Sequence, residues 1–186
     1  MNRADFRRGV RDVAPLVLGV APFGLVAGIA AVNAGLDLSQ AVGMSVIVFA
    51  GASQLAALDL IGKNAPASVV VLTAVVINLR MLMYSASIAH HFRAFAGRVK
   101  AGLAYLLTDQ AYALAIASYR NERSVDRVAY YLGVAATLWV VWQLTTVAGV
   151  LLGTGVPDAW GLVFAVPLVF LALLVPALED GPPPVA

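Results

Sequence analysis

An arginine in the middle of an apolar stretch constrains this chain more than any other feature. Residues 69–92 read VVVLTAVVINLRMLMYSASIAHHF, close to the roughly 20 residues that a helix needs to cross a bilayer. Arg80 lies near the midpoint, where a guanidinium costs at least about 2.5 kcal/mol. The fold must therefore give Arg80 a partner, a water-filled cavity or an anionic ligand. The alternative is an ion pair that only locks two helices together.

The polar residues around Arg80 predict where this segment lies. On a regular helix the residues that share the face of Arg80 are Thr73, Tyr84, Ser87 and His91. Asn78 and Ser85 share a second, nearly opposite face. A helix that is polar on two sides is expected inside a bundle and not against lipid.

The composition places the chain in a membrane. Hydrophobic residues make up 61% and charged residues 12% of the sequence, and the mean hydropathy is +0.88. Soluble domains carry about twice that charged fraction, so we predict an all-α integral membrane protein. The absence of cysteine excludes disulfides and thiolate sites. His90 and His91 are adjacent and lack a nearby acidic pair, so we expect no metal and no other cofactor.

The chain divides into about six hydrophobic segments. They cover residues 13–36, 39–61, 69–92, 103–118, 128–152 and 159–178. We expect residues 1–12 to form a basic cytoplasmic lead, 13–178 a transmembrane helical domain and 179–186 a disordered tail. Trp139 and Trp142 lie near the centre of the fifth segment, away from the interface, and are predicted to pack against protein or to line a cavity.

The second segment has small and polar residues at its centre. Gly51, Ser53 and Gln54 fall within the sequence FAGASQ. Transporters use broken helices of this kind to aim half-helix ends at a substrate or ion. A close helix crossing that requires small residues is the alternative.

The fourth segment is interrupted in its middle at Thr108-Asp109-Gln110. Thr or Asp before an apolar run is typical of a helix start, because the side-chain oxygen accepts from free backbone N–H groups. The segment is therefore predicted to be two short helices that meet at Asp109. Asp109 is also the best intramembrane partner for Arg80, or else a carboxylate that carries a proton.

The distribution of basic residues bears on topology. Six simple crossings would place Arg93, Arg98 and Lys100 outside, against the tendency of basic loops to stay in the cytoplasm. If segments two and four are re-entrant, only Lys63 is misplaced, and the two enter from opposite faces, as inverted repeats do. The length of segment two, which suffices to span a bilayer, is the argument for the simple crossing.

Three motifs resemble one family. Residues 51–54 (GASQ), residues 78–87 (NLRMLMYSAS), and Thr108-Asp109 followed by Tyr112-Ala-Leu are similar to the AzlC family, the large subunit of branched-chain amino acid exporters. The likeness covers about residues 6–178. It implies outward movement of valine, leucine, isoleucine and in some cases methionine, together with a small hydrophobic AzlD-like partner. Members are usually longer, which implies a shortened member or a fragment.

The motifs and the spacing together predict a substrate site. The expected substrate-binding residues are Gly51, Ser53, Gln54, Asn78, Arg80, Tyr84, Ser85 and Asp109. Arg80 can hold a carboxylate in a bidentate fork, and Asp109, Asn78 and carbonyls at the helix breaks can receive an ammonium. Gly51 and Ser53 allow backbone N–H groups to approach the substrate. The expected proton-coupling candidates are Asp109, His90 and His91.

Two other functions remain open alongside transport: a passive pore or channel, and a scaffold subunit that does not transport. We do not expect an enzyme, because Ser53 lacks a Gly-x-Ser-x-Gly surround and the histidines lie at a segment end. The expected surroundings are the lipid bilayer of the cell membrane, crossed several times with the N-terminus in the cytoplasm. No nucleic-acid partner is expected, because the basic clusters lack interleaved aromatic residues and a soluble domain.

Overall fold

The computed structural model describes residues 2–121 and 125–155, and this part of the chain is all-α. The helices are α1 (Arg3–Asn33), α2 (Leu38–Ile47), α3 (Gly51–Gly62), α4 (Ala67–Asn78), α5 (Arg80–Ala89), the 3₁₀ turn η1 (His90–Phe92), α6 (Gly97–Tyr105), α7 (Asp109–Asn121) and α8 (Arg127–Gly155). The predicted sixth segment and the predicted tail lie outside the described residues.

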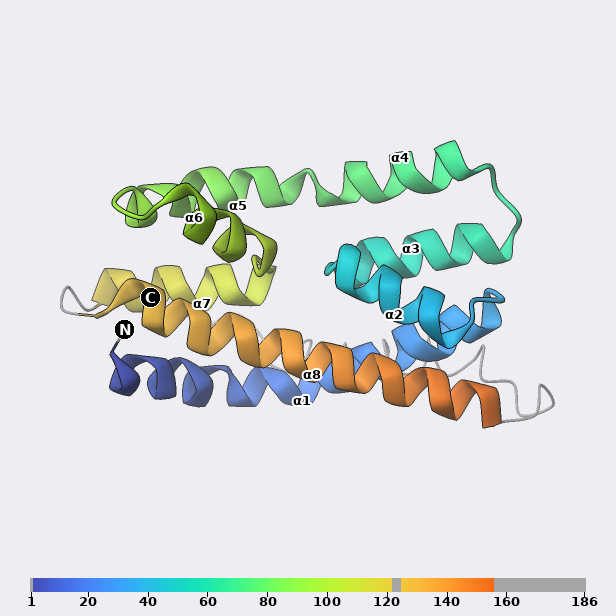
Figure 1. The fold of residues 1–186 in the computed structure, drawn as a ribbon, viewed down its shortest axis with the longest axis horizontal. Coiled ribbons are helices and arrows are strands. Elements are labelled where there is room, and N and C mark those ends of the chain that lie inside the picture. Colours follow the sequence, from blue (N-terminus) through green and yellow to red (C-terminus); the bar gives the residue numbers. More distant parts are fainter. Residues whose placement is uncertain (1, 122–124, 156–186) are drawn as a thin grey trace, which may run out of the picture.

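Three stretches of the described chain are long and apolar enough to cross a membrane: Arg3–Asn33, Ala67–Phe92 and Arg127–Thr154. Each runs the length of the molecule in Figure 1. They confirm the predicted class of all-α membrane protein. The basic lead is not a separate element, because residues 3–12 form the first turns of α1.

The second and fourth segments are helical hairpins. The arms α2 and α3 both lie in the half of the molecule where α1 ends, while α6 and α7 lie in the half where α1 begins (Figure 1). Residues 48–50 and 106–108 interrupt the helices at the two tips. The predicted breaks in both segments are therefore confirmed. Both segments fold back as hairpins, as the re-entrant prediction requires, and segment two is not one continuous crossing helix.

Local capping chemistry starts one arm of each hairpin. The Asp37 carboxylate accepts from the backbone N–H of Gln40 at 2.8 Å, and the Gln40 side chain accepts from the backbone N–H of Asp37 at 3.0 Å. Hydrogen bonds from the Ser39 hydroxyl and the Gln40 backbone lower the pKa of Asp37. At the other tip, Thr108 Oγ1 accepts from the backbone N–H of Ala111 at 3.2 Å, so α7 begins at the predicted break.

The outer helices α1 and α8 pack through glycines. A Cβ on Gly28 would collide with the Thr146 carbonyl oxygen and lie 2.7 Å from the Val150 nitrogen. A Cβ on Gly149 would likewise meet the backbone of Leu25. The two backbones therefore touch, as small residues allow in membrane helices.

The segment that contains Arg80 lies at the edge of the described bundle, against expectation. None of the residues of α4 is buried, and Leu72, Leu82 and Met83 are 64%, 67% and 68% exposed. The expectation of a helix buried on two sides is wrong for this part of the chain. The helix is also interrupted at Leu79, between α4 and α5.

The two hairpins meet at their tips. The Tyr105 hydroxyl at the end of α6 donates to the Val46 carbonyl of α2 at 2.7 Å. The same oxygen accepts from the Trp139 indole N–H of α8 at 2.9 Å. One phenol group thus joins both hairpins to a spanning helix in the middle of the molecule.

The hairpin topology predicts which positions share a side of the membrane. The chain contains no cysteine, so single cysteines can be introduced at Asp37, Lys63 and Gly97 and labelled in intact cells. We expect positions 37 and 63 to give the same result with an impermeant thiol reagent, and position 97 to give the opposite result, because it lies on the other side. Ser45→Cys, at a fully buried position, is the unlabelled control. Labelling of 37 and 63 on opposite sides would contradict the first hairpin.

The contact between α1 and α8 predicts an asymmetric response to alanine. Gly28→Ala should destabilise the folded protein by about 1–3 kcal/mol, because the new methyl group meets backbone that cannot move aside. Gly43→Ala in α2 is the matched control, since a Cβ there meets nothing within 4 Å and alanine favours the helix. Thermal melting in detergent measures both. Equal melting temperatures for the two variants would contradict the close packing.

Candidate functional site

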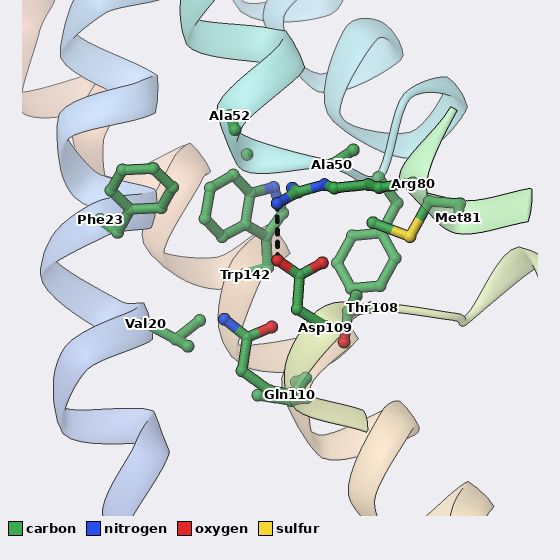
Figure 2. Close-up of a pocket in the computed structure, with 13 residues that line it drawn as sticks. Val20, Phe23, Ala50, Ala52, Arg80, Met81, Thr108, Asp109, Gln110 and Trp142 are labelled. Carbon is green, nitrogen blue, oxygen red and sulfur yellow. Dashed lines mark ion pairs between the residues drawn. The ribbon is translucent and has the colours of Figure 1, made fainter. Parts of the chain in front are cut away.

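A cavity of about 220 Å³ lies where the two hairpin tips meet α5 (Figure 2). Its lining comes from both tips and from all three spanning stretches. The lining residues are Val20, Phe23, Phe49, Ala50, Gly51, Ala52, Arg80, Met81, Thr108, Asp109, Gln110, Leu138 and Trp142. Segments far apart in the sequence therefore build one compartment at the middle of the molecule.

An ion pair stands at the wall of this cavity. Arg80 Nη1 and Asp109 Oδ2 are 2.8 Å apart, which confirms the predicted partnership between the two residues. Their side chains remain 34% and 37% exposed. Figure 2 shows the guanidinium lying beneath the first hairpin tip and meeting the carboxylate from the second. The pair is therefore not sealed between helices, because both charges border open space.

Two helix starts add positive potential to the cavity. The helix α3 begins at Gly51 and has no side-chain cap on its first turn, and α7 begins at Asp109. The first N–H groups of a helix lack intrahelical partners and favour an anion. The formal charges of Arg80 and Asp109 cancel, so the start of α3 leaves a partial positive charge where a ligand carboxylate could bind.

Two buried donors beside the cavity lack partners. Arg80 Nε and the indole nitrogen of Trp142 make no hydrogen bond within the described residues. Buried polar groups are normally paired, so these two donors would be stabilised by an acceptor from a ligand or water. Both donors belong to lining residues.

The wall opposite the ion pair is apolar. Val20 and Phe23 of α1 face the cavity together with Leu138 and Trp142 of α8, and the rings of Phe23 and Trp142 lie 5.6 Å apart. A Cβ on Gly51 would approach Trp142 Cη2 to 2.6 Å. The glycine therefore lets the first hairpin tip rest against these two rings, which is a packing reason for its small size.

The structure brings three of the expected site residues to the cavity: Gly51, Arg80 and Asp109. Ser53 and Asn78 form a hydrogen-bonded pair beside it, and Gln54 is buried in α3 with no partner for its Oε1 among the described residues. Asn78 Nδ2 donates to Ser53 Oγ at 3.0 Å, and Ser53 Oγ donates to the Ala50 carbonyl at 3.0 Å. Asn78 thus supports the first hairpin tip from α4.

The remaining expected residues lie away from the cavity. Tyr84 stacks on Tyr112 of α7, with ring centroids 4.6 Å apart, and Ser85 lines a different groove between α5 and α6. His90 and His91 lie in η1 at the end of the span. The Nδ1 atom of His90 is 2.7 Å from the Ser87 carbonyl oxygen, and the His91 ring contacts Tyr119.

The sequence reasoning missed most of the apolar lining. Val20, Phe23, Met81 and Leu138 carry no signal that separates them from the many apolar residues of the same helices. The central position of Trp142 predicts that it packs against protein or lines a cavity, and it does both. Thr108 and Gln110 flank Asp109 at the predicted break, so the reasoning that selected Asp109 could also have selected them as lining residues.

Comparisons with known proteins agree with one another. A family model described as AzlC protein matches residues 15–156. A relative named "Uncharacterized membrane protein" from Archaeoglobus fulgidus is 30% identical, with 95% of this chain and 77% of the relative covered. "Inner membrane protein YgaZ" of Escherichia coli is 27% identical over 95% of this chain and 74% of its own. An "Uncharacterized membrane protein" of Helicobacter pylori J99 is 26% identical, at 91% and 75%. No solved structure matches.

The ion pair predicts strong thermodynamic coupling. In a double-mutant cycle of Arg80→Gln and Asp109→Asn, the stability effects should be non-additive by about 1–3 kcal/mol, because each single change leaves a charge unpaired. The pair between Asp59 and Lys63 is the control: its side chains are 60% and 69% exposed, so its coupling should stay below about 0.5 kcal/mol. Chemical or thermal unfolding measures both cycles. Additive effects at Arg80 and Asp109 would contradict the pairing.

Proposed function

The chain belongs to the AzlC family of membrane proteins, and on that premise we propose that it transports branched-chain amino acids out of the cell as the large subunit of a two-component carrier. The substrates would be valine, leucine and isoleucine, with methionine in some cases. The observation that carries the proposal is the ion pair between Arg80 and Asp109 at the wall of an apolar cavity.

An amino acid carries the same two charges as this ion pair. Its carboxylate can take the place of Asp109 on Arg80 and accept from the planar guanidinium in a bidentate fork. Its ammonium can then bind the released Asp109 carboxylate. The charges in the cavity are balanced before and after this exchange, so no uncompensated ion is left in the low-dielectric centre of the membrane.

The apolar wall suits the aliphatic side chain. Val20, Phe23, Leu138 and Trp142 offer methyl groups and ring faces without further hydrogen-bonding groups, apart from the indole nitrogen. The cavity volume equals that of roughly seven liquid water molecules. This size favours a single small amino acid, and the apolar lining disfavours polar side chains, whose groups would lose their hydration.

Orientation and energy coupling are part of the proposal. Most basic residues of the described chain lie at the end of the molecule where α1 begins, which we call the basic end. They are Arg3, Arg7, Arg8, Arg11, Arg93, Arg98, Lys100, Arg120 and Arg127. We propose that the basic end faces the cytoplasm, because basic loops tend to stay on that side of the cell membrane. Asp109 is the favoured proton-coupling residue because it lines the cavity, whereas His90 and His91 lie at the basic end of their span.

A small AzlD-like membrane subunit is the proposed partner. The outward face of α4 and α5 is apolar and uncovered by any described residue, with Val71, Leu72 and Val75 more than half exposed. A second membrane protein can pack against such a face without removing the lining of the cavity.

Counter-flow in proteoliposomes tests the proposal. Liposomes loaded with unlabelled leucine should accumulate labelled leucine saturably, with and without the small subunit compared side by side. Arg80→Ala should reduce this uptake by about tenfold or more, because charge-assisted hydrogen bonds contribute about 1.5–3 kcal/mol each. Arg80→Lys should also impair uptake, because lysine lacks the planar fork.

Lys63→Ala is the matched control, since it removes a cation at an exposed position outside the cavity. Its uptake should equal that of the unaltered chain. Flux that does not saturate would favour a passive pore, and absence of flux in both preparations would favour a scaffold subunit. Normal uptake by Arg80→Lys would overturn the bidentate role.

A further inference from the structure

A second hollow lies at the basic end, apart from the central cavity. It has a volume of about 470 Å³ and lies between α5 with η1 on one side and α6 on the other. One lining residue, Ser85, belongs to the motif of residues 78–87 that also contains Arg80. Apart from Tyr131 of α8, its lining residues all come from residues 85–107. We call this hollow the α5–α6 groove.

The floor of the α5–α6 groove is built and apolar. Ile88, Phe92, Leu103 and Leu107 are between 4% and 7% exposed, and Tyr131 is 1% exposed. The Tyr131 hydroxyl donates to the Leu103 carbonyl at 2.9 Å, which holds α6 against α8. The ring of Phe92 lies 5.5 Å from that of Tyr131. The floor is therefore fixed by packing on the spanning helices.

The rim of the groove is cationic. Arg93 and Lys100 border it from opposite sides of the turn between η1 and α6, and His90 stands beside them. All three are exposed, and no acidic residue lines the groove. Within the described residues Arg93 and Lys100 have no ion pair, so their charges are free to meet an anion from outside.

The position of the groove decides between possible anions. The span Ala67–Phe92 ends at this rim. If this span crosses the bilayer, the cations would lie at the membrane surface and the apolar floor would extend toward the hydrocarbon core. A headgroup phosphate with an acyl chain below it matches both parts. A free phosphate would leave the apolar floor unused. Basic pockets between membrane helices bind anionic headgroups in this way.

We propose that the α5–α6 groove binds an anionic phospholipid, with the phosphate held by Arg93 and Lys100 and one acyl chain along Ile88, Phe92, Leu103 and Leu107. The inference does not depend on what the central cavity carries. The lipid would fill the space between α5 and the α6 arm of the second hairpin at the basic end.

Native mass spectrometry of the full chain with equal amounts of phosphatidylglycerol and phosphatidylcholine tests the site. The protein should retain phosphatidylglycerol preferentially. Arg93→Ala combined with Lys100→Ala should weaken this binding by about thirtyfold, which corresponds to about 1 kcal/mol for each cation at a membrane surface. The control is Arg7→Ala combined with Arg98→Ala, which removes equal charge at the same end from residues outside the groove; its binding should stay near that of the unaltered chain.

A second variant tests the acyl-chain part without changing charge. Ala101 is exposed and lines the groove, so Ala101→Trp should fill it and reduce lipid retention while the fold is kept, as checked by circular dichroism. Equal retention of the two lipids would overturn the proposal. So would equal losses in the groove and control variants, or competition by inorganic phosphate as strong as that by phosphatidylglycerol, which would show a surface anion effect only.

Discussion

The ion pair between Arg80 and Asp109 is the interaction on which the middle of this molecule depends. A lone guanidinium or carboxylate at the centre of a membrane costs at least about 2.5 kcal/mol. The 2.8 Å contact pairs the two charges, yet their side chains stay 34% and 37% exposed. The fold therefore holds two charges at the centre of an apolar structure and leaves them accessible to a ligand.

The hairpins explain how polar backbone is tolerated at that depth. Backbone groups freed at a helix break must be satisfied within protein or face a cavity, never lipid. Both breaks lie between the spanning helices, and the side chains of Ser53, Asn78 and Thr108 bind groups at or near the tips. The close contact of α1 and α8 through glycines forms a wall behind them. The central cavity is thus a result of interrupting two helices and not of separating intact ones.

Much of this architecture could be read from the sequence, because membrane helices and their interruptions obey strong local rules. The capping residue at Thr108, the small residues at Gly51 and the misplaced charges at Arg93 and Lys100 together predict two re-entrant hairpins. The pairing of Arg80 with Asp109 follows from the scarcity of charges at mid-membrane. The apolar lining could not be predicted, since nothing local distinguishes Leu138 from its neighbours. Within the described residues the Arg80 segment lies at the edge and not inside the bundle as predicted, because polarity on two faces was interpreted without the break at Leu79.

The phenol group of Tyr105 has a mechanical consequence. Its hydroxyl donates to the Val46 carbonyl in the first hairpin and accepts from the Trp139 indole N–H in α8. A displacement of the first hairpin therefore stretches the bond to Val46, and a displacement of the second stretches both bonds. The two hairpin tips are thereby linked through one side chain. Moving one tip alone would break at least one of these two hydrogen bonds, so the positions of the two hairpins depend on each other.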